Sequence, residues 1–105
     1  MVSLPRAKIF YWTYHALGKM RFYRLSESRV RRVIHSPKRI EEGIAPKTIA
    51  VMQSAGSKGH PYEIWVMIQE EKNRRKVISA WRYPGITKPG QPLPEEILRE
   101  IRAAL

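Results

Sequence analysis

Apolar residues in the first third of the chain recur with the spacing of helices. The aromatic and β-branched run 8–13 (KIFYWT) predicts a strand, and Thr13 is a suitable N-cap for a helix from Tyr14 to about Arg24. Arg24 falls on the apolar side of this helix, where a charge needs a partner, so we expect it to have a structural role. Ser26 caps a second helix, ESRVRRVIH, whose aliphatic residues follow i, i+3, i+4 spacing. One strand and two helices are therefore predicted here.

The middle of the chain has the pattern of β-strands. Strands are predicted over 39–43, 47–54, 62–69 and 76–83. The last two are joined by EEKNRR, which suits an antiparallel hairpin with a charged tip. A register that pairs Gln69 with Lys76 puts Trp81 on the same face as Ile64, together with Ser79 and Tyr83. The opposite face then pairs Glu63 with Arg82. Both faces are largely apolar, so each needs a cover.

A connector and a helix complete the predicted architecture. Residues 84–94 (PGITKPGQPLP) predict a stiff connector, and the helix 95–105 that follows has an apolar stripe of Ile97, Leu98, Ile101 and Leu105. This helix either covers the second face of the sheet or docks on another chain. We predict a single α+β domain with a core at 1–83. In that core two N-terminal helices pack on a mainly antiparallel sheet of about four strands.

Positive charge is concentrated near the N-terminus. The chain has 20 Lys and Arg against 9 acidic residues, a net charge of +11. Residues 1–40 carry ten of these basic residues and a single Glu, a net charge of +9. A solvated helix surface accounts for an ordinary basic run, but charge concentrated in this way favours an anionic partner such as a phosphate polymer.

Composition excludes several classes of chemistry. The chain has no Cys and no Asp, which excludes disulfides, zinc–thiolate sites, thiol nucleophiles and any mechanism that needs an Asp. The three His lack metal-ligand spacing, and no phosphate-binding glycine loop is present. We therefore expect no metal and no cofactor. The absence of Cys allows a reducing compartment, so we take the cytoplasm as the default location. No apolar run approaches the roughly 20 residues of a membrane helix, so we expect no membrane contact.

Basic residues interleaved with aromatic side chains and His are typical of RNA binding. Lys and Arg neutralise phosphates, and exposed rings stack on unpaired bases. The candidate nucleic-acid-binding residues are Lys19, Arg21, Phe22, Arg29, Arg31 and Arg32. For cleavage, a His or Tyr beside an Arg can transfer a proton as a ribose 2′-OH attacks its phosphate. The catalytic candidates are His15, Arg82 and Tyr83. Alternatively, the aromatic side chains belong to the core, Arg82 pairs with Glu63 and His15 caps a helix; the aromatic residues concerned are Phe22, Trp65, Trp81 and Tyr83.

The order of residues resembles a known family over residues 8–83. Tyr14-His15-Ala16, Met20, Arg24-Leu25-Ser26 and the strand end VISAWR at 77–82 are similar to the BrnT-like domains and their relatives in the RelE/ParE toxin superfamily. The resemblance implies two N-terminal helices on an antiparallel sheet. It also implies messenger-RNA endonuclease activity, free or on the ribosome, that an antitoxin inhibits.

The resemblance assigns positions to the candidate residues. His15 matches the family histidine, Arg24 the arginine before the second helix, and Ser79, Arg82 and Tyr83 the polar end of the last strand. After Arg82 the chain departs from the family's Glu/Arg/Tyr-containing tail and continues into a C-terminal helix. The resemblance therefore supports the fold better than catalysis.

These observations predict a small basic RNA-binding protein and leave its activity open. In one form it is a metal-independent endoribonuclease toxin that pairs with an acidic antitoxin protein. In another it is a non-enzymatic domain that binds nucleic acid or an acidic protein. A third form is an interaction protein whose C-terminal helix pairs with a partner or with its own copy. The sequence predicts no oligomeric state.

Overall fold

A computed structural model describes residues 9–90, 93 and 95–104 of the chain. The described elements are, in chain order, β1 (Ile9–Trp12), α1 (Tyr14–Tyr23), α2 (Glu27–His35), β2 (Arg39–Glu42), β3 (Thr48–Gly56), β4 (Pro61–Glu70), β5 (Arg74–Pro84) and α3 (Glu95–Ala104). Residues 1–8, 91–92, 94 and 105 belong to the predicted core, connector and C-terminal helix but lie outside the described residues. None of the described helices combines the length and the apolar character needed to cross a membrane.

Both predicted N-caps are confirmed. The Thr13 hydroxyl accepts a hydrogen bond from the backbone N–H of Ala16 at 3.0 Å. The Ser26 hydroxyl accepts one from the backbone N–H of Arg29, also at 3.0 Å. Each cap satisfies a donor that the first turn of a helix leaves without a partner, so these short helices begin where the sequence predicts.

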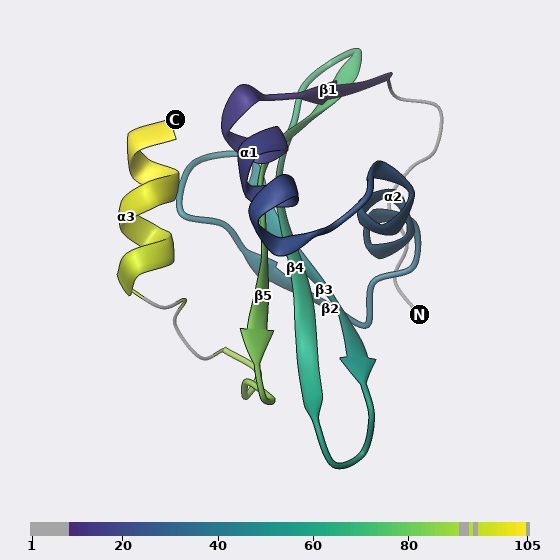
Figure 1. Cartoon of the computed structure of the whole chain (residues 1–105). Coiled ribbons are helices and arrows are strands. Elements are labelled where there is room, and N and C mark those ends of the chain that lie inside the picture. The colour runs from purple at the N-terminus through teal and green to yellow at the C-terminus, as the bar shows by residue number, and fades with distance from the viewer. Residues whose placement is uncertain (1–8, 91–92, 94, 105) are drawn as a thin grey trace.

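The strands form one mixed sheet in the order β1-β5-β4-β3-β2 (Figure 1). Every neighbouring pair is antiparallel except β1 and β5, which run parallel. The α+β class is therefore confirmed, but the sheet has five strands instead of about four. Strand β1 can run parallel to β5 because most of the chain separates the two strands, so no tight turn dictates their direction.

A β-bulge changes the predicted register of the β4–β5 hairpin. Gln69 pairs with Lys76 as predicted, but the register then shifts by one residue at Met67. Trp65 consequently pairs with Trp81, one position further along β5 than predicted. Because side chains alternate between faces, every residue of β5 after the bulge lies on the face opposite to the predicted one.

The bulge has two consequences for the predicted faces. Trp81 does not share a face with Ile64 but stacks on Trp65, with ring centroids 6.0 Å apart and ring planes only 4° from parallel. The alternative that placed these tryptophans in the core is confirmed. The predicted Glu63–Arg82 pair is wrong. Arg82 pairs with Ile64 and shares its face of the sheet, whereas the Glu63 side chain points to the other face.

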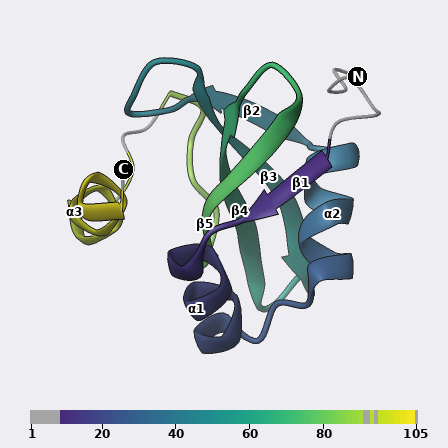
Figure 2. The same cartoon turned by 90° about the horizontal axis from the view of Figure 1, so that it is seen from above.

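Each face of the sheet carries a hydrophobic core. The core under α1 and α2 contains Ala16, Met20, Leu25, Val30, Val33, Ile34, Val51, Ile64, Val66, Ile68, Val77 and Ala80. The core under α3 contains Ala50, Met52, Trp65, Met67, Ile78, Trp81, Ile97 and Ile101. Figure 2 shows α2 and α3 on opposite sides of the sheet. Helix α3 thus packs on the second face of its own sheet.

Arg24 is the C-cap of α1 and is not part of the helix's apolar side. Its backbone is left-handed, with φ 57° and ψ 48°, and its N–H donates to the carbonyls of Met20 and Arg21 at the helix end. The side chain is exposed, so its predicted placement on the apolar side is wrong. The helix stops one residue earlier than predicted, and the chain turns there towards α2.

A buried carboxylate fastens the segment after β5 to the sheet. Glu63 is 2% exposed and accepts hydrogen bonds from the Thr87 N–H at 3.1 Å and the Thr87 hydroxyl at 2.7 Å. The indole N–H of Trp65 donates to the same carboxylate at 3.0 Å. Arg39 lies 3.9 Å from Glu63 and donates to the Thr87 carbonyl at 2.8 Å. The start of the predicted connector is therefore anchored.

Candidate nucleic-acid interface

Helix α2 turns its aliphatic side to the sheet and its arginines outward. All of its aliphatic residues are fully buried. Arg31 and Arg32 are exposed, and Arg29 is half-buried. The i, i+3, i+4 spacing of the buried residues produces this separation. Two of the predicted nucleic-acid-binding residues, Arg31 and Arg32, thus lie on the outer side of α2, and Arg29 lies at its border with the sheet.

Gln53 of β3 holds Arg29 in place. The Arg29 guanidinium donates to the Gln53 side-chain oxygen at 2.6 Å. The amide nitrogen of Gln53 donates to the carbonyls of Arg32 and Ser36, at 3.1 and 2.8 Å. One glutamine therefore binds both the arginine and the C-terminal end of α2. The guanidinium of Arg29 is fixed at the junction of α2 and the sheet.

Arg82 reaches the same side of the sheet from β5. Its Nε donates to the Tyr23 carbonyl at 2.8 Å, and its terminal nitrogen lies 3.5 Å from the Arg24 carbonyl. The guanidinium therefore binds carbonyls that α1 leaves without intrahelical partners. Its carbon lies 5.0 Å from the centre of the Tyr62 ring, which is within cation–π distance.

Arg29, Arg32 and Arg82 form what we call the arginine cluster. Burial lowers the pKa of Arg29, and the positive charge of Arg32 lowers it further; Tyr62 acts in the opposite direction, and Arg82 adds a smaller lowering. Within the described part of the chain, none of the three forms an ion pair with a carboxylate. Neighbouring cations repel each other, and a bound anion would relieve that repulsion.

The predicted binding residues of α1 differ in their surroundings. The Lys19 ammonium lies 2.6 Å from the Glu100 carboxylate of α3, and the rings of Phe22 and Tyr23 are 5.3 and 5.2 Å away. Arg21 is exposed, and Phe22 is 73% exposed. The alternative that placed Phe22 in the core is therefore wrong. Its ring is available for stacking, whereas Lys19 is already paired with an acid.

Arg31 contacts the edge strand β1. Its guanidinium carbon lies 4.6 Å from the centre of the Phe10 ring and 5.4 Å from that of Trp12. The Glu27 carboxylate, one helical turn earlier, is 4.0 Å away. Arg31 therefore has an acidic neighbour and aromatic contacts that distinguish it from the arginine cluster.

His15 lies beside Ser79 of β5. Its Nε2 is 3.2 Å from the Ser79 hydroxyl, which belongs to a residue only 2% exposed. Burial, followed by the charge of Lys19, lowers the pKa of His15, and Glu100 acts in the opposite direction. A neutral imidazole at neutral pH can accept a proton. The alternative that made His15 a helix cap is wrong, because Thr13 has that role.

The three catalytic candidates have different neighbours. His15 contacts Ser79, whereas Arg82 binds the end of α1. Tyr83 is half-buried against the core under α3. Consecutive residues of a strand point to opposite faces, so Arg82 and Tyr83 cannot act on one group from the same side. The catalytic role of these residues stays a prediction.

Two polar residues of this surface were not predicted from the sequence. Gln53 positions Arg29, and Tyr62 lies against Arg82. Neither residue belongs to a motif. Both lie in strands, where the sequence pattern indicates only which face of the sheet a side chain occupies. Their roles follow from which strand ends lie beside α2 and beside the end of α1.

The described residues contain no group of three or more His or Glu side chains placed to hold a metal ion. No protein-family model matches the chain, and no curated protein or solved structure matches it either.

Proposed function

We propose that the protein binds RNA through the arginine cluster and the exposed side chains next to it on α1 and α2. One observation carries this proposal: Arg29 and Arg32 of α2 and Arg82 of β5 lie on one side of the sheet, near enough for their charges to interact, and none of them pairs with a carboxylate among the described residues. A phosphate backbone supplies the missing negative charge and releases its own counterions on binding. The net charge of +11 favours the same class of partner at longer range.

The cluster keeps hydrogen-bond donors for phosphate. A guanidinium has five N–H groups in a fixed fork. Arg82 uses its Nε and one terminal nitrogen for the carbonyls of α1, and Arg29 uses one terminal nitrogen for Gln53. The remaining N–H groups, together with the exposed Arg32, can bind phosphate oxygens.

Single-stranded RNA fits this surface better than a duplex. Phe22 is exposed on α1, one residue before the Tyr23 carbonyl that Arg82 binds. Exposed rings next to arginines stack on bases that are not paired, which is how most sequence-tolerant single-strand binding arises. Phe22 is therefore assigned to base stacking and the arginine cluster to the backbone.

The proposal extends to the RelE-like fold and to a toxin role. Two N-terminal helices on one face of a largely antiparallel sheet agree with the resemblance. The parallel pairing of β1 departs from the antiparallel sheet that it implies, and the helix α3 lies outside the residues that it covers. In the catalytic form of the proposal, His15 accepts the proton of the 2′-OH as its oxygen bonds to phosphorus, and Arg82 stabilises the charge on the phosphate. The bond from phosphorus to the 5′-oxygen then breaks, and that oxygen takes a proton from water. An acidic antitoxin would occupy the same positive surface.

A non-enzymatic RNA-binding domain is the second candidate. The different neighbours of His15, Arg82 and Tyr83 favour it, because a cleavage site needs its groups around one phosphate. In this form Arg82 contributes to binding and to the end of α1, and the neutral His15 is a structural partner of Ser79.

Binding is tested by fluorescence anisotropy with a labelled single-stranded RNA of mixed sequence over a range of salt concentrations. The double variant Arg29→Gln/Arg32→Gln should weaken binding about tenfold and reduce the slope of log affinity against log salt by about 1.4. The control Arg99→Gln/Arg102→Gln removes the same charge from exposed residues of α3, on the opposite side of the sheet. This control should bind the RNA with nearly the affinity of the unmodified protein.

Equal losses in the two double variants would contradict the placement of the interface, because binding would then depend on net charge alone. Absence of binding at low salt would contradict the function itself. Circular dichroism on each variant establishes that a loss of affinity is not a loss of fold.

Cleavage is tested separately with end-labelled RNA in EDTA, with and without ribosomes. If the catalytic form is correct, His15→Ala and Arg82→Ala each lower the cleavage rate by about 10² or more. His35→Ala is the control, because His35 is exposed at the end of α2. Intact RNA in the presence of a protein that binds it would support the non-enzymatic candidate.

A further inference from the structure

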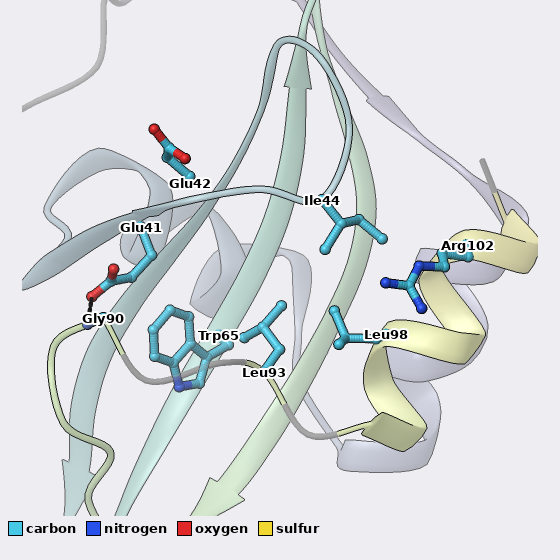
Figure 3. Close-up of a pocket in the computed structure, with 8 residues that line it drawn as sticks. All are labelled: Glu41, Glu42, Ile44, Trp65, Gly90, Leu93, Leu98 and Arg102. Atoms are coloured by element: carbon cyan, nitrogen blue, oxygen red, sulfur yellow. Dashed lines mark hydrogen bonds between the residues drawn. The ribbon is translucent and has the colours of Figure 1, made fainter.

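A cleft lies on the face of the sheet opposite the arginine cluster. It has a volume of about 510 Å³ and opens between α3, the loop after β2 and the segment after β5 (Figure 3). Its lining includes Glu41, Ile44, Trp65, Leu93, Leu98 and Arg102. A volume of this size is within the usual range of small-molecule sites, roughly 300 to 1,000 Å³.

The middle of the cleft is apolar. The side chains of Ile44, Leu93 and Leu98 converge there from three separate segments, and each is only partly buried (Figure 3). Trp65 closes the floor, and its indole N–H already donates to Glu63. The central part of the cleft therefore presents apolar surface to a ligand, and the indole N–H of Trp65 is not free to bind it.

The charged side chains around the cleft differ in whether they already have hydrogen-bond or ion-pair partners. Glu41 accepts from Arg39 at 3.2 Å and from the Gly90 N–H at 3.3 Å, so its carboxylate already has partners. Glu42 points away from the apolar walls in Figure 3. The Arg102 guanidinium points towards them, and no described residue pairs with it. At one end of an apolar cleft thus stands a positive charge that has no carboxylate partner in the described part of the chain.

We propose that this cleft binds a small amphipathic carboxylic acid. Its apolar body lies between Ile44, Leu93 and Leu98, and its carboxylate pairs with Arg102. Arginine suits this role because its planar fork matches a carboxylate with two parallel hydrogen bonds. An amine of the same shape would meet repulsion from Arg102, and an alcohol would lack the ion pair. The cleft is separate from the arginine cluster, because the sheet lies between them.

The test uses three probes with one apolar body: 3-phenylpropionate, 3-phenylpropan-1-ol and 3-phenylpropylamine. Each is titrated into ¹⁵N-labelled protein while the Trp65 indole N–H and the amides of Ile44 and Leu98 are followed by NMR. The acid should shift these signals saturably and bind about threefold to fivefold more tightly than the alcohol, with the amine weakest. In Arg102→Gln the acid should bind no better than the alcohol.

Arg99→Gln is the matched control, because Arg99 is exposed on the same helix but does not line the cleft. It should keep the preference for the acid. The proposal is overturned if none of the probes produces saturable shifts at these residues up to millimolar concentration. It is also overturned if the amine binds as well as the acid, or if Arg102→Gln keeps the preference.

Discussion

Replacing Glu63 by Gln probes the buried network that fastens the segment after β5 to the sheet. The Glu63 carboxylate accepts three hydrogen bonds, two from Thr87 and one from the Trp65 indole. A glutamine has the same size but only one acceptor oxygen. If that oxygen takes the position that receives Trp65 and the Thr87 hydroxyl, the new NH₂ group faces the Thr87 backbone N–H. One buried donor is then left without an acceptor.

The expected cost follows from these contacts. A buried donor without a partner costs about 1–3 kcal/mol, and hydrogen bonds to a charged acceptor are stronger than neutral ones. Removing the charge also removes the desolvation penalty of a residue that is 2% exposed, which offsets part of the loss. Because Arg39 lies 3.9 Å away and already compensates that charge, we expect a net loss of about 2 kcal/mol. This lowers the melting temperature by about 8–16 °C.

The measurement is thermal and urea denaturation followed by circular dichroism. Glu42→Gln is the control, because it changes the charge equally at an exposed residue and should alter stability by less than about 0.5 kcal/mol. If Glu63→Gln were as stable as this control, the network would not stabilise the fold. Thr87→Val should lose part of the stability that Glu63→Gln loses. If Thr87→Val were as stable as the unmodified protein, the role given to the Thr87 hydroxyl would be contradicted.

Further predictions concern the first helix and are measured as free energies of unfolding. Thr13→Val should destabilise by about 1–2 kcal/mol, because its hydroxyl caps Ala16 and donates to the Val77 carbonyl at 3.0 Å, whereas Thr13→Ser should keep most of the stability. Since burial and Lys19 lower the pKa of His15, the unfolded chain binds the proton more readily, so stability should fall as the pH drops below about 6.5. This part of the pH dependence should vanish in His15→Gln, and its persistence there would assign it to other groups. Arg24→Gly should stabilise by about 0.5–1 kcal/mol because φ is 57°, and a loss would show that the side chain contributes.

Local features of the fold could be predicted from the sequence because they depend on neighbours along the chain. Thr13 and Ser26 begin helices because their hydroxyls accept from N–H groups three residues later. The i, i+3, i+4 spacing of α2 separates its buried aliphatic residues from Arg31 and Arg32. The two apolar faces of β4 and β5 likewise predict a cover on each side. The surface position of the arginines on α2 is therefore a property of the sequence.

Only the tertiary structure decided which distant residues meet. One extra residue in β5 reverses the alternation after the bulge, which moves Trp81 under α3 and Arg82 to the side of α1 and α2. The position of Arg82 on the same side of the sheet as Arg29 follows from that reversal. The hydrogen bond from Arg29 to Gln53 follows from the packing of α2 on β3. Periodicity indicates which side of a strand a residue occupies but contains no information on bulges or strand neighbours, because these depend on packing between segments far apart in the chain.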